Sequence, residues 1–418
     1  MVNTGRPLLT VLVGAGGSIE LGVPSTQDLT RIAEDAISSF HVRGPQDFIE
    51  RPVEPIARTL IEHCQQHYGS QYSFEHLLHV LETAETLLEG RPFGGKPVAE
   101  MFLTSGHNPA LNLVFDEAFL GLAQKYLIEA IHNAISGASD GARQHPSWAD
   151  MSKFWERLDE EFDLKVVSLN YDTLVDRALG LGGEAQWFES ISDELAWRFK
   201  PPIEQLCPRL MHLHGGIHFG YRDFRADSNR FACEDEFDDL YWLPTSKEAL
   251  NSLNSSRTAM SDYNQAGRKC IKGPLITGLN KPDKLLLEPY RSYFSSFDTL
   301  TRQSKRLIVI GYGFGDLHVN AVIRAMTKWH GPRRRIAVVD YVDGEGYFSS
   351  AWMPHDRVSN DKIVTIKRWA EAEDFLEDMW LSVNPVASKN ELVRFYHKGF
   401  LEFARCHLDD LVAFMTGC

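Results

Sequence analysis

Three short segments of this 418-residue chain combine glycine with side chains that could take part in chemistry. They are residues 14–18, 168–174 and 211–216, and each follows or ends an apolar run typical of a strand in a parallel sheet. In open α/β sheets, ligands bind beyond the carboxyl ends of the strands. We therefore expect the three segments to meet at one edge of a sheet and to share a site.

The first segment is Gly14-Ala15-Gly16-Gly17-Ser18, which follows the apolar run 8–13. A glycine loop between a strand and a helix lets backbone N–H groups approach a phosphate, and the helix N-terminus favours the anion. The pattern departs from the dinucleotide fingerprint because Ile19 takes the last glycine position, and it lacks the Gly-Lys-Ser/Thr of a P-loop. A tight turn that binds no ligand is the alternative.

The second segment places Asn170 and Asp172 just past the apolar run 164–169. An amide and a carboxylate two residues apart could hold sugar hydroxyls and a carboxamide. The alternative is local, because Asp172 could cap a following helix while Asn170 makes a turn.

The third segment carries a histidine before two glycines, His214-Gly215-Gly216. A histidine at a strand end can face an open cleft, and its ordinary pKa suits a general base near neutral pH. His212, His214 and His218 together could suggest a metal site. We expect none there, because His212 and His214 would share one face of a strand with no acidic partner nearby.

The apolar runs around these segments predict the elements that position them. We expect strands at 8–13, 164–169, 210–213, 307–310 and 336–339, a weaker one at 275–277, and a helix at 319–329 that joins the last two strong strands. The sequence therefore predicts an α/β fold with a Rossmann-like parallel sheet flanked by helices.

Other parts of the chain have different patterns. A capping box at Ser25-Thr26-Gln27-Asp28 predicts the start of a helix, and 45–160 shows helical periodicity without a clear strand. Residues 219–272 are polar and irregular, and 370–418 have a helical pattern with a break at Pro385.

In their order along the chain, these motifs resemble the sirtuin family. Sirtuins open with a Gly-Ala-Gly-x-Ser loop and a nearby Gly-Ile-Pro, followed by Gln-Asn-x-Asp and then His-Gly. The matching residues here are Gly14-Ala15-Gly16-Gly17-Ser18, Gly22-Val23-Pro24, Leu169-Asn170-Tyr171-Asp172 and His214-Gly215. The loop 310–316 lies where sirtuins carry a glycine-containing loop that touches the cofactor, and Asp340 lies where they read the adenosine ribose.

The resemblance implies roles for these residues toward NAD, which would be a substrate. It assigns Asn170 to the nicotinamide ribose and the attacking water, Asp172 to the carboxamide, and His214 to the role of base. The other residues that it implies in NAD binding are Gly14, Ala15, Gly16, Ser18, Pro24, Gly311, Gly313, Asp316 and Asp340.

Several features of the sequence depart from protein deacylases of the family. Leu169 replaces the glutamine before Asn170, Ser25-Thr26-Gln27 replaces Asp-Phe-Arg, and the zinc module with two CxxC pairs is absent, so we expect no zinc. The chain resembles instead the sirtuin-like proteins of bacterial antiviral systems. Their fold hydrolyses NAD to deplete the cell, and some members work with a HerA-type ATPase.

This resemblance implies an NAD glycohydrolase of anti-phage defence, with a homo-oligomer and a HerA-type ATPase as expected partners. A module that only binds NAD or ADP-ribose, or scaffolds a defence complex, is the alternative, and a deacylase is a further one. We expect one sirtuin-like domain over 5–370, with a helical insertion at about 40–160 and an irregular region at about 219–272, followed by a C-terminal helical segment over 371–418.

Composition narrows the classes of partner and compartment. The net charge of −14 disfavours a protein that coats nucleic acid, and no apolar run approaches the length of a membrane span. The run 8–13 is too short for a signal peptide and leads into a glycine loop, so a buried strand is expected instead. The six scattered cysteines favour a reducing, cytoplasmic compartment.

Overall fold

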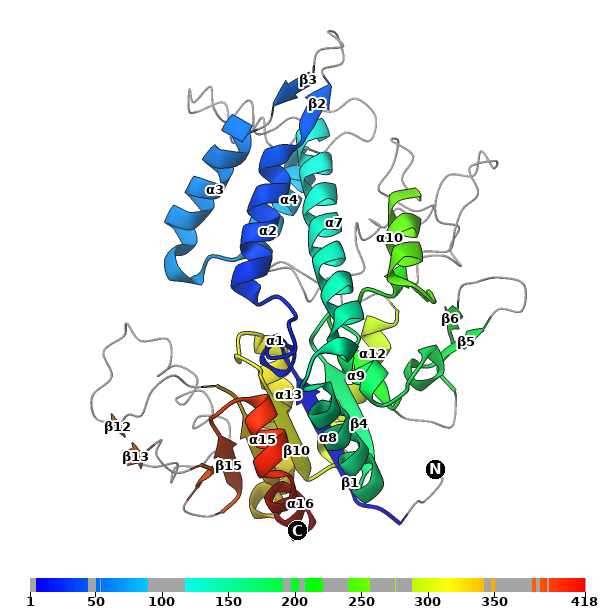
Figure 1. Cartoon of the computed structure of the whole chain (residues 1–418), viewed down its shortest axis with the longest axis vertical. Coiled ribbons are helices and arrows are strands. Elements are labelled where there is room, and N and C mark those ends of the chain that lie inside the picture. Colours follow the sequence, from blue (N-terminus) through cyan, green and yellow to red (C-terminus); the bar gives the residue numbers. More distant parts are fainter. Residues whose placement is uncertain are drawn as a thin grey trace.

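The structure is a computed structural model of the whole chain, shown in Figure 1. It describes residues 5–43, 50–52, 54–88, 117–190, 197–202, 207–220, 240–255, 275, 288–341, 347–349, 378–380, 384–388 and 391–417.

A seven-stranded sheet forms the centre of the lower part of the molecule in Figure 1. Its spatial order is β14-β15-β11-β10-β1-β4-β7, and every pairing is parallel except that of β14 with β15. The strands are β1 (Leu8–Val13), β4 (Asp163–Ser168), β7 (Leu210–His212), β10 (Arg306–Ile310), β11 (Arg335–Val339), β14 (Val386–Ala387) and β15 (Val393–Tyr396).

The parallel strands follow the order of a doubly wound α/β fold. Numbered along the chain, the six parallel strands lie in the spatial order 6-5-4-1-2-3, which is the Rossmann order read from one end. The predicted fold class is therefore confirmed, and the five strongly predicted strands are all present within one residue at each end. The order reverses between β1 and β10, and that point is where ligands bind in such sheets.

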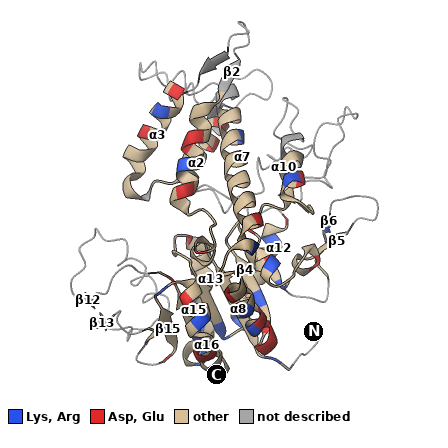
Figure 2. Ribbon diagram, viewed as in Figure 1, with Lys and Arg blue, Asp and Glu red and all other residues tan. Residues whose placement is uncertain are grey.

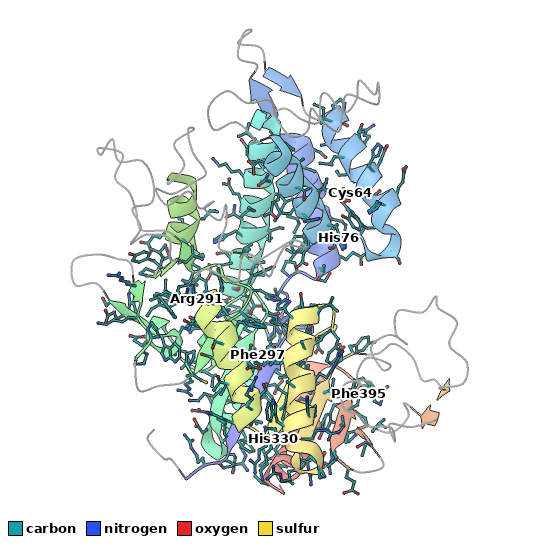
Figure 3. All side chains as sticks on the ribbon, turned by 180° about the vertical axis from the view of Figure 1, so that it is seen from behind. Cys64, His76, Arg291, Phe297, His330 and Phe395 are labelled. Carbon is teal, nitrogen blue, oxygen red and sulfur yellow. The ribbon has the colours of Figure 1, made fainter. Side chains whose placement is uncertain are left out.

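The two faces of the sheet are buried under different helices. Alternate strand residues such as Leu12 and Val309 pack against α12 (Tyr290–Gln303) and α13 (Leu317–His330), which lie side by side in Figure 3. Val11 and Ile308 face the opposite way, toward α8 (Trp148–Glu161), α15 (Phe400–Cys406) and α16 (Leu408–Thr416). Burial on both faces explains why these strands are near-continuous apolar runs in the sequence. The predicted helix at 319–329 is confirmed as α13.

A layer of helices stands above the carboxyl edge of the sheet in Figure 1 and has an apolar core of its own. Its members are α2 (Thr26–Ser39), α3 (Glu54–Tyr68), α4 (Phe74–Leu88) and α7 (Glu117–Gly141), and α7 contacts both α2 and α4. The predicted capping box is confirmed, because the Asp28 N–H donates to Ser25 Oγ and the Ser25 N–H donates to Asp28 Oδ2. None of the helices among the described residues is long and apolar enough to cross a bilayer.

Two predictions about the periphery are wrong in part. A short hairpin, β2 (His41–Arg43) with β3 (Glu50–Pro52), follows α2, and β3 lies within 45–160, where no clear strand was expected. The stretch 370–418, expected to be helical, contains β14 and β15, and β15 is the sixth parallel strand of the sheet. Strands of two to four residues are too short to show a periodicity in the sequence. Such segments become strands because they pair with a neighbouring strand, not because of their own residue pattern.

The predicted irregular region 219–272 lies largely outside the described residues. Its described parts are β8 (Phe219–Gly220), β9 (Tyr241–Trp242) and α10 (Ser246–Ser255), and the two strands form a four-stranded sheet with β5 (Phe188–Ser190) and β6 (Trp197–Phe199). The weak strand predicted at 275–277 is seen only as an isolated bridge between Leu275 and Gly215, since 276 and 277 are not described.

Charged side chains of both signs are mixed on the outer helices (Figure 2). Arg58 pairs with Glu54 on α3, and Arg157 pairs with Glu161 on α8. Such exposed pairs contribute little to stability, so the buried layers described above hold the fold together.

The loop after β10 packs backbone to backbone on the glycine loop after β1. Gly311 has φ of 59°, and a Cβ placed on it would lie 2.2 Å from Gly17 N and 2.3 Å from the Gly16 carbonyl carbon. Gly313, two residues on, has no atom within 4 Å of such a Cβ. Only a residue without a side chain allows the two loops to approach this closely.

We expect Gly311→Ala to lower the free energy of unfolding by about 3 kcal/mol or more, because both overpacking and backbone strain oppose it. Gly313→Ala is the matched control and should change stability by less than about 0.5 kcal/mol. Chemical denaturation of the two variants measures the difference, and equal midpoints would contradict the close packing of the two loops.

Candidate functional site

A cavity lies where the strand order reverses, between the carboxyl edge of the sheet and the helical layer. It encloses about 820 Å³ of empty space, including its open mouth. The three segments singled out in the sequence all contribute to its wall, as does the loop after β10. The lining residues are Gly14, Ala15, Val23, Pro24, Thr26, Leu29, Phe74, Glu75, Ile135, Leu169, Asn170, Tyr171, Asp172, His214, Gly311, Tyr312, Gly313, Gly315 and Asp316.

The glycine loop uses several of its backbone groups inside the protein. The Gly14 N–H donates to the Ile310 carbonyl (2.8 Å) and the Gly16 N–H to the Gly311 carbonyl (2.9 Å). The helix that follows at once, α1 (Gly16–Ile19), has only four residues. Gly14 and Ala15 line the cavity, whereas Gly16 and Ser18 do not, so these two predicted ligand-binding residues support its wall from behind.

Asn170 joins the second segment to the first. Its Nδ2 donates to the Gly14 carbonyl and to Ser18 Oγ, each at 3.0 Å, and the side chain is buried at the cavity wall. Both donors of the amide are thereby engaged, and its carbonyl oxygen is the remaining polar atom. The residue expected to touch a substrate therefore also holds the glycine loop in place.

Asp172 does not take the N-cap position considered for it, which Thr173 occupies at the start of α9 (Leu174–Ala178). Its Oδ1 accepts a hydrogen bond from the Leu174 N–H (3.0 Å), two residues on, as in an Asx turn. It also lines the cavity. Burial raises the pKa of Asp172 above the ordinary aspartate value, although hydrogen bonds from Leu174 and Ser18 oppose the shift.

His212 has an acidic partner, contrary to the sequence-based expectation. Its Nε2 lies 3.0 Å from Asp176 Oδ2 and its Nδ1 lies 3.2 Å from the Asn170 carbonyl oxygen, with all these groups buried. Burial alone would lower the pKa of His212, but the Asp176 carboxylate and these hydrogen bonds outweigh it and raise that pKa. Both partners are acceptors, so the raised pKa of His212 favours the doubly protonated ring, which can donate to Asp176 and to the Asn170 carbonyl at once.

The other two histidines of the third segment have separate surroundings. The Nδ1 of His218 lies 2.7 Å from the Leu243 carbonyl oxygen, and its ring stacks on Trp242. His214 is buried in the cavity wall, where its Nε2 lies 3.2 Å from Nε2 of His318. His212, His214 and His218 thus do not share one set of partners, and His214 groups instead with residues at the start of α13.

Hydrogen bonds within the loop 311–316 fix its shape. The Tyr312 hydroxyl accepts from the Asp316 N–H (3.0 Å) and donates to Asn320 Oδ1 (2.7 Å), while Asn320 Nδ2 donates to the Phe314 carbonyl (2.9 Å). Phe314 has φ of 59°, an unusual conformation that these bonds stabilise. The loop therefore holds Asp316 at the cavity wall.

Nine of the twelve site residues expected from the sequence line this cavity, and Gly16, Ser18 and Asp340 do not. The nine are Asn170, Asp172, His214, Gly14, Ala15, Pro24, Gly311, Gly313 and Asp316. Asp340 instead accepts a hydrogen bond from the Tyr341 N–H through its own Oδ1 (2.8 Å). Glu75 and Tyr171 also line the cavity and His318 lies beside it, and none of the three was among the expected site residues. The only sequence signal for His318 was that it lies two residues after Asp316.

A comparison with protein families bears on this geometry. Residues 164–353 match the model of the SIR2-like domain. The SIR2-like match covers less than half of the chain, and it includes Asn170, Asp172, His214 and the loop 311–316. No curated protein matches the sequence.

Two solved structures are similar to the chain at low identity. The structure of Sir2Tm bound to a propionylated peptide is 12% identical with a TM-score of 0.36, covering 97% of this chain and 93% of that chain. A second structure, described as the structural basis of sirtuin substrate affinity, is 13% identical with a TM-score of 0.37. The match covers 97% of this chain and 94% of that chain. A likeness at these scores says nothing about activity, so the SIR2-like match and the cavity carry the functional conclusion.

The buried pair of His212 and Asp176 should be important for stability. We expect Asp176→Asn to lower the free energy of unfolding by about 3 kcal/mol, because it leaves the charge on His212 buried without its counter-ion. Asp140→Asn is the control, since Asp140 pairs with Arg177 but is exposed, and it should cost less than about 0.5 kcal/mol. Denaturant unfolding of both variants provides the comparison, and similar losses would contradict this role of the buried pair.

His132 of α7 predicts a dependence of stability on pH. Burial lowers the pKa of His132 to about 4, although its hydrogen bond with the Ile217 carbonyl (3.0 Å) acts against the shift. The unfolded chain binds this proton near pH 6.5, so the stabilisation is complete above that pH and is lost as the pH falls toward 4.

From pH 7.5 to pH 5 we expect this group to remove about 2 kcal/mol from the free energy of unfolding. Denaturation across this range should show a smaller loss for His132→Gln than for the wild type. His63→Gln, at an exposed position on α3, should follow the wild type. Parallel curves for all three proteins would show that His132 does not titrate as described.

Proposed function

We propose that this chain cleaves the bond between nicotinamide and ribose in NAD, giving nicotinamide and ADP-ribose. The observation that carries the proposal is one cavity, at the point where the strand order reverses, whose wall contains Asn170, Asp172 and His214 together. The SIR2-like match over 164–353 supports the same substrate. A dinucleotide is the ligand that this position in a doubly wound sheet favours.

The chemistry needs little acid catalysis, because nicotinamide leaves as a neutral molecule from a cationic ring. The C–N bond breaks with its electron pair going to the ring nitrogen, and a water oxygen forms the new bond to the ribose carbon. The protein must orient the sugar, stabilise the positive charge that develops on it, and remove a proton from the water. We propose that His214 accepts the proton from the attacking water. The carbonyl oxygen of the Asn170 side chain would position the ribose and the water.

The remaining contacts follow from the lining of the cavity. Gly14, Ala15, Gly311 and Gly313 present backbone without side chains larger than a methyl group, which suits the diphosphate. We assign the carboxamide to Asp172. Gly16 and Ser18 lie behind the wall, so we assign them a supporting role. We assign Asp340 to a position near the adenosine half of NAD.

The biological role that we propose is depletion of NAD in bacterial antiviral defence, in the cytoplasm. It rests on the resemblance of the motifs to that group of sirtuin-like proteins. A homo-oligomer and a HerA-type ATPase partner belong to the same proposal, and the assay below is therefore run with and without the products of neighbouring genes.

A second candidate is a module that binds NAD or ADP-ribose without cleaving it. It is favoured by one observation, namely that Asn170 and Asp172 both make hydrogen bonds within the protein. Such a module would bind NAD tightly and release no nicotinamide under any partner condition.

Release of nicotinamide from NAD by the purified full chain tests the proposal. We expect His214→Ala and Asn170→Ala to lower the rate by about 100-fold or more, in the range typical of a lost general base or a lost positioning contact. His63→Ala, on the exposed face of α3, should retain the wild-type rate.

Titration calorimetry with NAD is run on the same variants, so that loss of binding is distinguished from loss of cleavage. Full activity in either site variant would remove that residue's assignment. Tight binding without turnover in the wild type would favour the second candidate, and consumption of acetyl-lysine in equal amount with nicotinamide release would identify a deacylase instead.

A further inference from the structure

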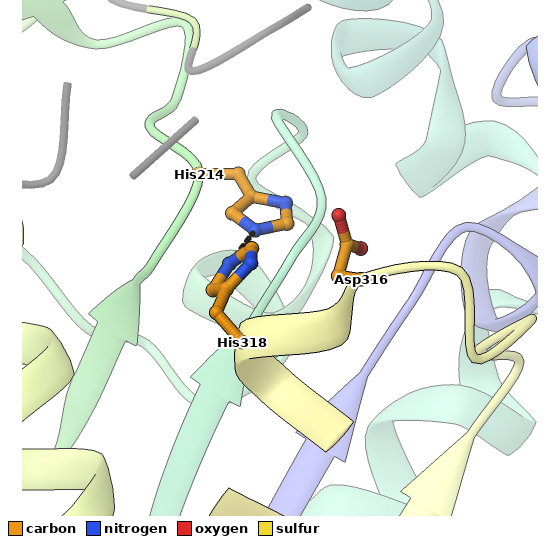
Figure 4. A group of neighbouring side chains, drawn as sticks. All are labelled: His214, Asp316 and His318. Carbon is orange, nitrogen blue, oxygen red and sulfur yellow. Dashed lines mark hydrogen bonds between the residues drawn. The ribbon is translucent and has the colours of Figure 1, made fainter. Parts of the chain in front are cut away.

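Three potential metal ligands converge beside the cavity. His214 comes from the segment after β7, and Asp316 and His318 come from the start of α13 (Figure 4). One ligand atom from each residue lies within 4.8 Å of the other two. Among the residues that the structure describes, no other group of three histidine, cysteine or acidic side chains has this geometry.

The spacing fits the coordination shell of a small divalent ion. Zinc binds imidazole nitrogen at about 2.0–2.1 Å, so two nitrogens of a tetrahedral site lie about 3.3 Å apart. The Nε2 atoms of His214 and His318 are 3.2 Å apart and point toward one another in Figure 4. The carboxylate of Asp316 lies within 4.8 Å of one ring nitrogen of each histidine, close enough to supply a third ligand after a side-chain adjustment.

The backbone around the three ligands is held in place. His214 follows β7, whose last residue pairs with Ser168 of β4. Asp316 and His318 follow the loop that Tyr312 and Asn320 fix through their hydrogen bonds. Ligands on rigid elements lose little conformational entropy when a metal binds, which favours a site that is already formed.

We propose that His214, Asp316 and His318 form a binding site for a divalent transition-metal ion of the zinc type. Two imidazoles and one carboxylate form a donor set that zinc accepts, with three protein ligands and one open position. His214 and Asp316 line the cavity, so the open position faces the space where a ligand would lie. This site differs from the group of His212, His214 and His218 considered in the sequence. Its acidic ligand, Asp316, and its second histidine, His318, come from the segment that follows β10.

A bound metal would change what His214 can do. Its Nε2 lone pair would be donated to the metal, so this nitrogen could not accept a proton from water at the same time. The metal-loaded form and the form with a free general base would therefore exclude one another. This consequence rests on the function proposed above, whereas the binding of metal does not.

Metal binding is tested on the purified full chain after removal of metals with a chelator. Titration calorimetry with zinc chloride, and the visible absorption of bound Co²⁺, should show one site that contains histidine. His318→Ala should weaken its affinity by more than the roughly 10–100-fold cost of losing an outer-shell partner, and Asp316→Asn should also weaken it. His330→Ala, at the other end of α13, is the matched control and should bind as the wild type does.

The comparison between variants decides the outcome, because other histidines and cysteines of the chain can take up zinc. Circular dichroism confirms that each variant is folded, and His318 is partly exposed, so its replacement is tolerable. Equal stoichiometry and affinity in the wild type and His318→Ala would overturn the proposal. Nicotinamide release is not measured here, so this result stands apart from the outcome for the proposed function.

Discussion

The close contact between two glycine loops sets the geometry of the whole site. Gly311 lies against the backbone of Gly16 and Gly17 at a distance that excludes any Cβ. This contact lies where the strand order reverses, and it brings the ends of β1 and β10 together. If the two loops were held farther apart, Gly14 and Tyr312 could not face the same cavity.

From that contact, the site is built outward by hydrogen bonds between segments that are far apart in the sequence. Asn170 bonds to the glycine loop, and His212 bonds to the backbone of Asn170 while it pairs with Asp176. Each polar group is buried and has a partner, which makes such a network rigid once it is complete. The wall of the cavity is thus formed before any ligand arrives, and binding need not order it.

Much of the fold could be predicted from the sequence, because strands covered on both faces need continuous apolar runs. The runs at 8–13 and 307–310 are of this kind, and both are strands of the sheet. β15 was missed because it has four residues and follows a proline-containing segment, and only its pairing with β11 makes it a strand. Asn170, Asp172 and His214 could be found since each directly follows a buried strand, whereas Glu75 on α4 carries no such local signal.

The apolar strands, the glycines that allow close backbone approach and the polar residues that end the strands can all be found in the sequence alone. These are local properties, since burial and backbone freedom select residue types at single positions. The pairing of His212 with Asp176, and the meeting of His214 with His318 and Asp316, arise from the fold. Side chains separated by tens of residues become partners when the packing of strands and helices sets the distance and direction between them.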